Sequence, residues 1–294
     1  MKRTGFISIV GRPNVGKSTL LNSILGQKVA IVSSKPQTTR NRIAGIETRG
    51  DDQFVFLDTP GIFKPQNTLG DFMVKTANSA MQESDAVVLV ADAGFAPGDV
   101  EERVIDYLKQ SGTPAILALN KIDLYRGEAV ANTILAYAAL YDFSAVVPIS
   151  AKKGKAVEEV LDECAKLLHE GEWFYEEDML TDQPQRQMVA EIIREKILRT
   201  LDKEIPHGVA VVIEEYKEEE GLVRIRAEIF CEKASHKGIL VGKNGETLKR
   251  IGSYAREDMQ KLLETQVYLN LWVKVKENWR DSQRGILNFG YTEE

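Results

Sequence analysis

The chain has 294 residues, of which 43% are hydrophobic and 28% charged, and a net charge of −6. No apolar run approaches the roughly 20 residues that span a bilayer, and the first residues lack a signal-peptide pattern, so we expect a cytoplasmic globular protein of two domains. The acidic charge excludes a globally basic nucleic-acid-binding protein, so any such surface has to be local. Cys164 and Cys231 have no cysteine or histidine at metal-ligand spacing, which argues against a zinc site and a disulfide framework.

The first half of the chain alternates short apolar runs with segments of helical periodicity. The helical segments include residues 100–110 and 157–168. The apolar runs cover residues 6–10, 54–57, 86–90, 115–119 and 145–149. Because continuous apolar runs are typical of strands buried on both faces, the alternation predicts an α/β domain with a mostly parallel, doubly wound sheet over residues 1–170.

An acidic and aromatic stretch, GEWFYEEDMLTDQP, breaks this alternation and predicts a linker over residues 171–185. We interpret its aromatic residues as packing between the domains. A helix, two strands, two helices and a last strand follow, which predicts an α+β domain over residues 186–278 and a tail over residues 279–294. The segment EEYKEEEG, residues 214–221, is interpreted as a solvated turn between the two strands.

The segment GRPNVGKS, residues 11–18, matches G-x-x-x-x-G-K-[ST] between a predicted strand and a predicted helix. Glycines let backbone N–H groups point at phosphate oxygens, and the N-terminus of the helix adds partial positive charge. Lys17 is expected to reach the β- and γ-phosphates, and the Ser18 hydroxyl to ligate Mg²⁺. These residues predict a nucleoside triphosphate site.

The motif DTPG, residues 58–61, follows the next buried strand. Asp58 is expected to hold Mg²⁺ through a water molecule, and Gly61 to turn its N–H towards the γ-phosphate.

Upstream, the polar segment QTTR, residues 37–40, has no regular pattern, which is typical of a mobile loop. Either Thr38 or Thr39 is then placed to complete the Mg²⁺ shell.

The motif NKID, residues 120–123, comes directly after an apolar run, at the carboxyl edge of the predicted sheet where ligands bind. The Asp123 carboxylate can accept hydrogen bonds from the guanine N1–H and amino group, a donor pair that adenine lacks. The segment SAK, residues 150–152, fits a loop that supports the base from its other side. The nucleotide is therefore predicted to be GTP or GDP.

The position after the DTPG glycine, where a glutamine often orients the attacking water, is occupied by Ile62. Since positioning and electrostatics carry phosphoryl transfer, this predicts slow hydrolysis by the protein alone.

In the second domain, GKNG at residues 242–245 joins two predicted helices, and its glycines allow close approach to a nucleic-acid backbone. Residues 232–256 contain six lysine or arginine residues against two glutamates, so a local basic surface is possible. For the apolar residues Ile239, Leu240, Val241 and Ile251 a groove and a core position are equally compatible with the sequence. For Trp279 and Arg280 we favour a structural cap over RNA stacking.

The ordered motifs GRPNVGKS, QTTR, DTPG, NKID and SAK resemble those of translation-factor-related GTPases. The order α-β-β-α-α-β with GKNG resembles a type II KH domain. Together with the GEWFYEED segment, the whole chain resembles the Era-like family of bacterial GTPases.

The resemblance implies GTP hydrolysis, favours Thr39 over Thr38 as the Mg²⁺ ligand, and implies bound K⁺ at Asn14. The residues expected to act in hydrolysis are Asn14, Lys17, Thr39 and Gly61. The residues expected to bind nucleotide or Mg²⁺ are Gly11, Asn14, Val15, Gly16, Lys17, Ser18, Thr19, Thr38, Thr39, Asp58, Gly61, Asn120, Lys121, Asp123, Ser150, Ala151 and Lys152. The residues expected to bind RNA are Lys237, Gly242, Lys243, Asn244, Gly245, Lys249 and Arg250.

Members of the resembled family act in maturation of the small (30S) ribosomal subunit, so the implied partner is 16S rRNA near its 3′ end. The resemblance also implies peripheral association with the inner membrane, and we expect a monomer. The alternative interpretation is a peripheral-membrane signalling GTPase whose C-terminal domain binds a protein, because a basic helical surface also suits acidic partners or lipids. RNA binding distinguishes the two.

Overall fold

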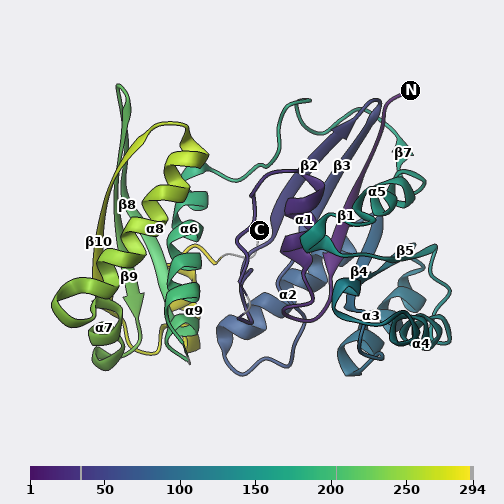
Figure 1. Cartoon of the computed structure of the whole chain (residues 1–294), viewed down its shortest axis with the longest axis horizontal. Helices are drawn as coiled ribbons and strands as arrows, with labels where there is room; N and C mark the ends of the chain where they lie inside the picture. Colours follow the sequence, from purple (N-terminus) through teal and green to yellow (C-terminus); the bar gives the residue numbers. More distant parts are fainter. Residues whose placement is uncertain (34, 203, 292–294) are drawn as a thin grey trace. The chain divides into compact units, whose positions relative to one another are not determined.

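The computed structural model describes residues 1–33, 35–202 and 204–291, so the last three residues of the predicted tail lie outside the described residues. The chain forms two compact units (Figure 1). The first contains most of the chain up to Asp182, and the second most of the chain from Gln183 onwards.

The first unit is built on a sheet with the strand order β2-β3-β1-β4-β5-β6, and β7 pairs with β1. All pairs along this order are parallel except β2 with β3, which confirms the predicted mostly parallel sheet. The strands are β1 (Arg3–Val10), β2 (Ile43–Arg49), β3 (Asp52–Asp58), β4 (Ala86–Asp92), β5 (Ala115–Asn120), β6 (Ala145–Pro148) and β7 (His169–Glu170). β2 and β7 were not among the predicted strands, because neither contains a long apolar run.

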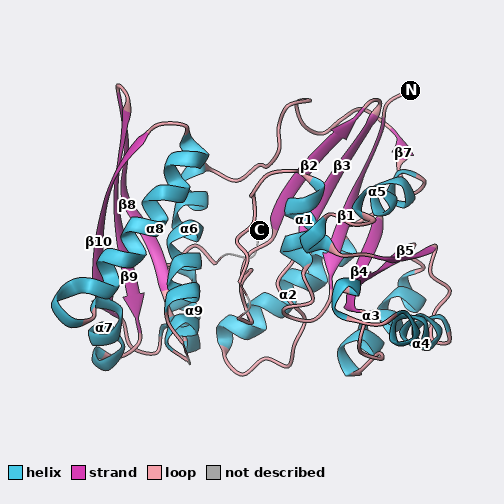
Figure 2. Cartoon of the chain, in the orientation of Figure 1, coloured by secondary structure: helices cyan, strands magenta, loops and turns pink. Residues whose placement is uncertain are grey.

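Helices cover both faces of this sheet (Figure 2). On one face, α1 (Lys17–Ile24) and α5 (Val157–Ala165) bury apolar residues against β1, β3, β4 and β5. On the other face lie α2 (Thr68–Gln82), α3 (Asp99–Ser111) and α4 (Gly127–Ala138). This three-layer arrangement places the ends of β1, β3, β5 and β6, with the motifs that follow them, at one edge of the sheet.

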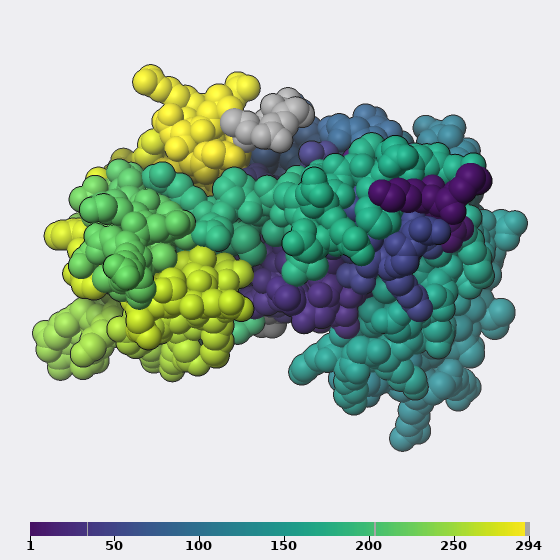
Figure 3. All heavy atoms as spheres, turned by 90° about the horizontal axis from the view of Figure 1, so that it is seen from above, coloured from purple at the N-terminus to yellow at the C-terminus, as the bar shows by residue number. Residues whose placement is uncertain are grey.

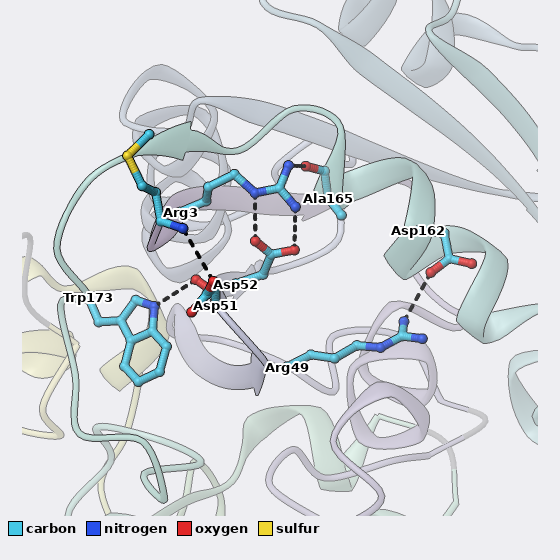
Figure 4. Close-up of polar contacts among 8 residues, drawn as sticks. Arg3, Arg49, Asp51, Asp52, Asp162, Ala165 and Trp173 are labelled. Atoms are coloured by element: carbon cyan, nitrogen blue, oxygen red, sulfur yellow. Dashed lines mark hydrogen bonds and ion pairs between the residues drawn. The ribbon is translucent and has the colours of Figure 1, made fainter.

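Residues after α5 pack against the first unit. β7 pairs antiparallel with β1 next to the N-terminus, and teal atoms lie beside the purple ones in the space-filling view (Figure 3). Trp173 donates its indole N–H to the Asp51 carbonyl at 3.1 Å, beside the bidentate ion pair of Arg3 with Asp52 (Figure 4). The ring of Phe174 lies 4.7 Å from that of Phe6. These contacts of Trp173 and Phe174 therefore lie within the first unit, whereas the sequence was interpreted as indicating packing between the domains.

The buried side chain of Gln53 is a hydrogen-bonding centre for the same segment. Its amide oxygen accepts the N–H groups of Phe174 and Tyr175 at 2.9 and 3.1 Å, and its amide nitrogen donates to the Tyr175 carbonyl at 2.9 Å.

Further along, Leu180 and Thr181 run beside the open edge of β2. Ile46 N–H donates to the Leu180 carbonyl at 2.9 Å, and Thr181 Oγ1 donates to the Ala44 carbonyl at 2.7 Å.

The second unit has the predicted order, with a three-stranded sheet β10-β9-β8 in which β10 is parallel and β8 antiparallel to β9. Its elements are α6 (Gln185–Thr200), β8 (Ala210–Glu219), β9 (Leu222–Cys231), α7 (Ala234–Val241), α8 (Glu246–Leu263) and β10 (Gln266–Val275). One core joins apolar residues of α6, α7 and α8 to those of the sheet. Among the described residues, no helix has the combination of length and apolarity needed to cross a bilayer.

The acidic segment 214–221 was wrongly interpreted as a turn. Most of it belongs to β8, which continues to Glu219 after an irregularity between Ile213 and Glu215. Basic residues on β9 explain this, because Arg224 forms a 2.9 Å ion pair with Glu219 and Arg226 lies 3.9 Å from Glu215. Cross-strand pairs of opposite charge stabilise a solvent-facing strand that its composition alone disfavours.

The C-terminal segment caps the second unit, as the sequence analysis favoured. Trp279 is 1% exposed, donates its indole N–H to the Gly208 carbonyl at 3.0 Å and stacks on Tyr291. Arg280 forms ion pairs with Glu204 and Glu232 at 3.0 and 2.6 Å. A short helix, α9 (Gln283–Leu287), follows.

Candidate nucleotide-binding and RNA-binding sites

The loop between β1 and α1 contains the predicted phosphate cradle. Gly16 has a φ of 106°, and a Cβ atom there would lie 2.2 Å from Nδ2 of Asn120, so only glycine fits. Lys17 is buried, and its ammonium group donates to the carbonyls of Gly11 and Arg12 at 3.2 and 3.0 Å. Burial lowers the pKa of Lys17 to about 8, although the nearby charge of Asp58 opposes this shift.

Three oxygen-bearing side chains meet beside this loop. Ser18 Oγ donates to Asp58 Oδ2 at 2.6 Å and lies 2.9 Å from Thr39 Oγ1, which itself donates to Asp58 Oδ2 at 3.2 Å. The other Asp58 oxygen, Oδ1, is buried without a hydrogen-bond partner among the described residues. Burial raises the pKa of Asp58, with Lys17 and the two hydroxyls acting in the opposite direction.

This arrangement fits Mg²⁺, which prefers hard oxygen ligands and would satisfy the unpartnered carboxylate oxygen. In the described part of the chain, no group of three or more His, Cys, Asp or Glu side chains could hold a metal ion, so one carboxylate and two hydroxyls are what the protein offers here. Thr38 is directed elsewhere, because its hydroxyl donates to the Lys35 carbonyl at 2.8 Å.

Asn120, at the end of β5, connects three loops of the site. Its Nδ2 donates to the Val15 carbonyl at 2.8 Å, and its Oδ1 accepts the N–H groups of Lys121 and Ala151 at 2.8 and 2.9 Å. Ser150 Oγ donates to Asp123 Oδ1 at 2.7 Å. This hydrogen bond holds the pKa of Asp123 below its usual value, so the group is an ionised acceptor at neutral pH.

The other predicted residues of this site differ in their environment. Val15 is buried, Thr19 lies half-buried in α1, and Asn14 is exposed with a φ of 65°. Lys152 is exposed, and Gly61 lies against Pro13, because a Cβ at Gly61 would be 2.7 Å from the Pro13 nitrogen. The side chain of Ile62 is buried in the core between β1, β4, α2 and α3. The position after the DTPG glycine therefore offers no polar side chain that could orient an attacking water molecule.

Two residues of this region were missed by the sequence analysis. Asp92, at the end of β4, accepts from the Lys121 ammonium group at 2.8 Å, and Lys153 lies 3.7 Å from Asp123 Oδ2. The position of Asp92 at the carboxyl end of a parallel strand is a signal that could have identified it. Lys153 carries no comparable sequence signal.

The GKNG loop lies between α7 and α8 as a short turn over Lys243–Gly245. Asn244 and Gly245 have φ values of 53° and 80°, and the side chains nearby leave open space at Gly245. Among the described residues, the basic side chains predicted to bind RNA are exposed and form no ion pair, which leaves their charge available to phosphates. They are Lys237, Lys243, Lys249 and Arg250.

The structure also separates core from surface among the four apolar residues whose role the sequence left open. Leu240 and Ile251 are fully buried in the core of the second unit, and Val241 is partly buried against it. Ile239 is 48% exposed. Only Ile239 and part of Val241 can therefore contribute to an accessible groove beside the GKNG loop.

The fold and the two sites define a P-loop GTPase followed by a KH domain. The family models described as "50S ribosome-binding GTPase" and "KH domain" match residues 6–121 and 204–280. GTPase Era of Ruminiclostridium cellulolyticum is 49% identical over 290 residues, which cover 98% of this chain and 97% of the relative. GTPase Era of Clostridium kluyveri is 49% identical over 292 residues, 99% of this chain and 100% of the relative. The chain therefore belongs to the GTPase Era family and is a GTPase.

Two solved structures are similar over the whole chain. A variant of Aquifex aeolicus Era bound to GDP and AlF4⁻ has a TM-score of 0.95 and 39% identity, covering 99% of this chain and all of the other. Era in complex with MgGDPNP and nucleotides 1506–1542 of 16S ribosomal RNA has a TM-score of 0.94 and 38% identity, with complete coverage of both chains.

Proposed function

We propose that this chain binds GTP with Mg²⁺ in its first domain and the 3′ end of 16S rRNA on its KH domain, and assists assembly of the 30S subunit. One observation carries the proposal. The hydrogen bonds of Ser18 with Asp58 and of Asn120 with Val15 beside the GRPNVGKS loop, and a GKNG loop flanked by exposed basic side chains, occur in one chain. This chain is similar throughout to an Era protein in complex with both ligands.

In the proposed nucleotide complex, the base and the phosphates are held by different residues. Asp123 accepts hydrogen bonds from the guanine edge, and Asn120 holds the loops on either side of the base. The backbone N–H groups of the cradle and the Lys17 ammonium group bind the phosphates. Ser18 and Thr39 would coordinate Mg²⁺ directly and Asp58 through a water molecule, and the ion would neutralise charge on the β- and γ-phosphates.

Hydrolysis by the protein alone is proposed to be slow, because Ile62 is buried where related GTPases have a water-positioning glutamine. Asn14 is proposed to help hold a K⁺ ion that supplies part of the missing charge stabilisation. The measurement is GTP turnover in buffers that differ only in containing K⁺ or Na⁺. Equal rates in the two buffers would remove K⁺ from the proposal.

The two functions are separated by variants in opposite domains. Gly245→Asp places a side chain and a negative charge in the GKNG loop, so binding of an RNA of nucleotides 1506–1542 should weaken at least about tenfold while GDP binding is unchanged. Gly221→Asp is the matched control, because Gly221 also has a positive φ with open space around it but lies in the β8–β9 turn. Lys17→Ala should weaken nucleotide binding instead.

The assembly role is tested by crosslinking in cells and sequencing of the bound RNA. Enrichment at the 3′ end of 16S rRNA is expected. Reads scattered over messenger RNA without that enrichment would contradict the assembly role. The cytoplasmic location and the monomeric state remain predictions from the sequence, and the peripheral association with the inner membrane remains a prediction from the resemblance.

A further inference from the structure

Outside the recognised motifs, one buried carboxylate lies against the phosphate cradle. Glu101, in the first turn of α3, is 1% exposed and accepts from Nε of Arg12 at 2.5 Å. Its other oxygen accepts the backbone N–H of Gly98, at the start of the helix, at 3.1 Å. Glu101 therefore links the N-terminus of α3 to the second residue of GRPNVGKS.

One partner of this ion pair is buried, because the Glu101 side chain is 1% exposed whereas that of Arg12 is 39% exposed. The phenol ring of Tyr137 on α4 is fully buried, and burial, followed by the charge of Glu101, raises its pKa. Its hydroxyl therefore stays neutral beside the pair and adds no second negative charge. A buried carboxylate that loses its cation is strongly destabilised, so Arg12 and Glu101 hold each other in place.

On the other side, Arg12 is connected to two residues of the proposed phosphate site. Its backbone carbonyl accepts from the Lys17 ammonium group at 3.0 Å. Its neighbour Pro13 is in close contact with Gly61, and Ile62 N–H donates to the Gly11 carbonyl at 3.1 Å. A displacement of Arg12 would therefore move the backbone against which both Lys17 and the DTPG loop are placed.

We propose that Glu101 is a positioning residue for GTP hydrolysis, acting through Arg12 on the backbone of the phosphate cradle. The inference rests on the proposed roles of Lys17 and Gly61. Phosphoryl transfer depends mainly on positioning, and a displacement of about 1 Å from a residue remote from the chemistry can cost about a hundredfold in rate.

The test compares Glu101→Gln with Glu102→Gln, an exposed glutamate on the same turn of α3. Glutamine at position 101 can still accept the Gly98 N–H, so the start of the helix is kept while the charge opposite Arg12 is lost. We expect kcat to fall about tenfold in Glu101→Gln, with a smaller loss of GDP affinity, because GDP lacks the γ-phosphate that the DTPG loop contacts. Glu102→Gln should match the unchanged protein.

A double-mutant cycle shows whether Glu101 acts through Arg12. If it does, the double variant Arg12→Gln with Glu101→Gln has a kcat close to that of Glu101→Gln alone. If instead the kcat losses of the two single variants multiply, so that kcat of the double variant falls about a hundredfold, Glu101 does not act through Arg12. A lower melting temperature with an unchanged kcat would reduce Glu101 to a purely structural role.

Lys17→Ala distinguishes failure of this inference from failure of the proposed nucleotide site. If Lys17→Ala hydrolyses GTP normally, the proposed site is wrong. If Lys17→Ala is inactive while Glu101→Gln has the same kcat and KM as Glu102→Gln, only the positioning role of Glu101 is wrong.

Discussion

The side-chain amide of Asn120 donates a hydrogen bond to the Val15 carbonyl at 2.8 Å, which joins the NKID motif to the GRPNVGKS loop inside the protein. Because the same side chain also accepts the Ala151 N–H, Asn120 holds the two ends of the proposed nucleotide site at a fixed separation. Asn120 therefore has a structural role within the protein itself.

Replacement of Asn120 by alanine should therefore affect binding and stability together. It leaves buried backbone groups of Val15 and Ala151 unpaired, so we expect a loss of about 2 kcal/mol in the free energy of unfolding and at least about tenfold in GDP affinity. Denaturant titration and fluorescent-GDP binding measure the two. Asn132→Ala, an exposed position on α4, is the control, and similar losses there would contradict the prediction.

Exchange of Asp123 for asparagine should change the base preference. The asparagine amide cannot accept both hydrogen bonds from guanine, so GTP affinity should fall about a hundredfold. Xanthosine triphosphate, which has a carbonyl in place of the guanine amino group, should bind the variant better than GTP does, because the amide N–H can donate to that oxygen. Competition binding measures this preference, and an unchanged preference for GTP would exclude Asp123 as the base-reading residue. Asp142→Asn, at an exposed site, is the control.

The two adjacent threonines offer a matched pair for the switch loop. The Thr39 hydroxyl contacts Ser18 and Asp58, whereas the Thr38 hydroxyl contacts the Lys35 carbonyl. Thr39→Ala should lower the hydrolysis rate about tenfold and raise the Mg²⁺ concentration needed for half-maximal activity, while Thr38→Ala stays within about twofold. Turnover measured against Mg²⁺ concentration tests this. The reverse order of effects would assign the metal to Thr38.

GDP affinity should decline above pH 8. Burial lowers the pKa of Lys17 to about 8 in the free protein, whereas contact with phosphate favours the charged form. Above pH 8 the free protein has lost this proton and binding must take it up, so affinity should fall by up to about tenfold per pH unit. Calorimetry between pH 7.5 and 9 measures the slope. The same slope in Lys17→Ala would show that another group titrates.

The side chain of Gln53 should hold the segment after β7 in place. Gln53→Ala removes its hydrogen bonds to Phe174 and Tyr175 and leaves backbone groups unpaired, at a cost of about 2 to 4 kcal/mol in the free energy of unfolding. Hydrogen exchange of residues 173–175 should accelerate together with this loss. Gln110→Ala, at an exposed position on α3, should change neither quantity.

Most of the parallel sheet could be predicted from the sequence, because its signals are local. Apolar runs of four or five residues marked β1, β3, β4, β5 and β6, and the motifs after them have spacings that place Ser18, Asp58 and Asn120 at one edge of the sheet. Resemblance supplied the KH domain, since GKNG is a weak signal without the order of elements around it.

What the sequence could not predict depends on contacts between distant residues. β2 has few apolar residues in a row and is defined by pairing with β3 and by the hydrogen bond from Ile46 to Leu180. The extension of β8 depends on ion pairs with Arg224 and Arg226, and the burial of Glu101 depends on Arg12, 89 residues away.

The hydrogen bonds of Leu180 and Thr181 with β2 have a practical consequence for work on the isolated GTPase domain. A fragment that stopped at residue 170, where the sequence pattern places the domain end, would leave a seven-residue strand with unpaired backbone groups along its outer side. Such an edge is a template for self-association between copies. A fragment extended through Asp182 keeps that edge covered and is the one we expect to stay monodisperse in solution.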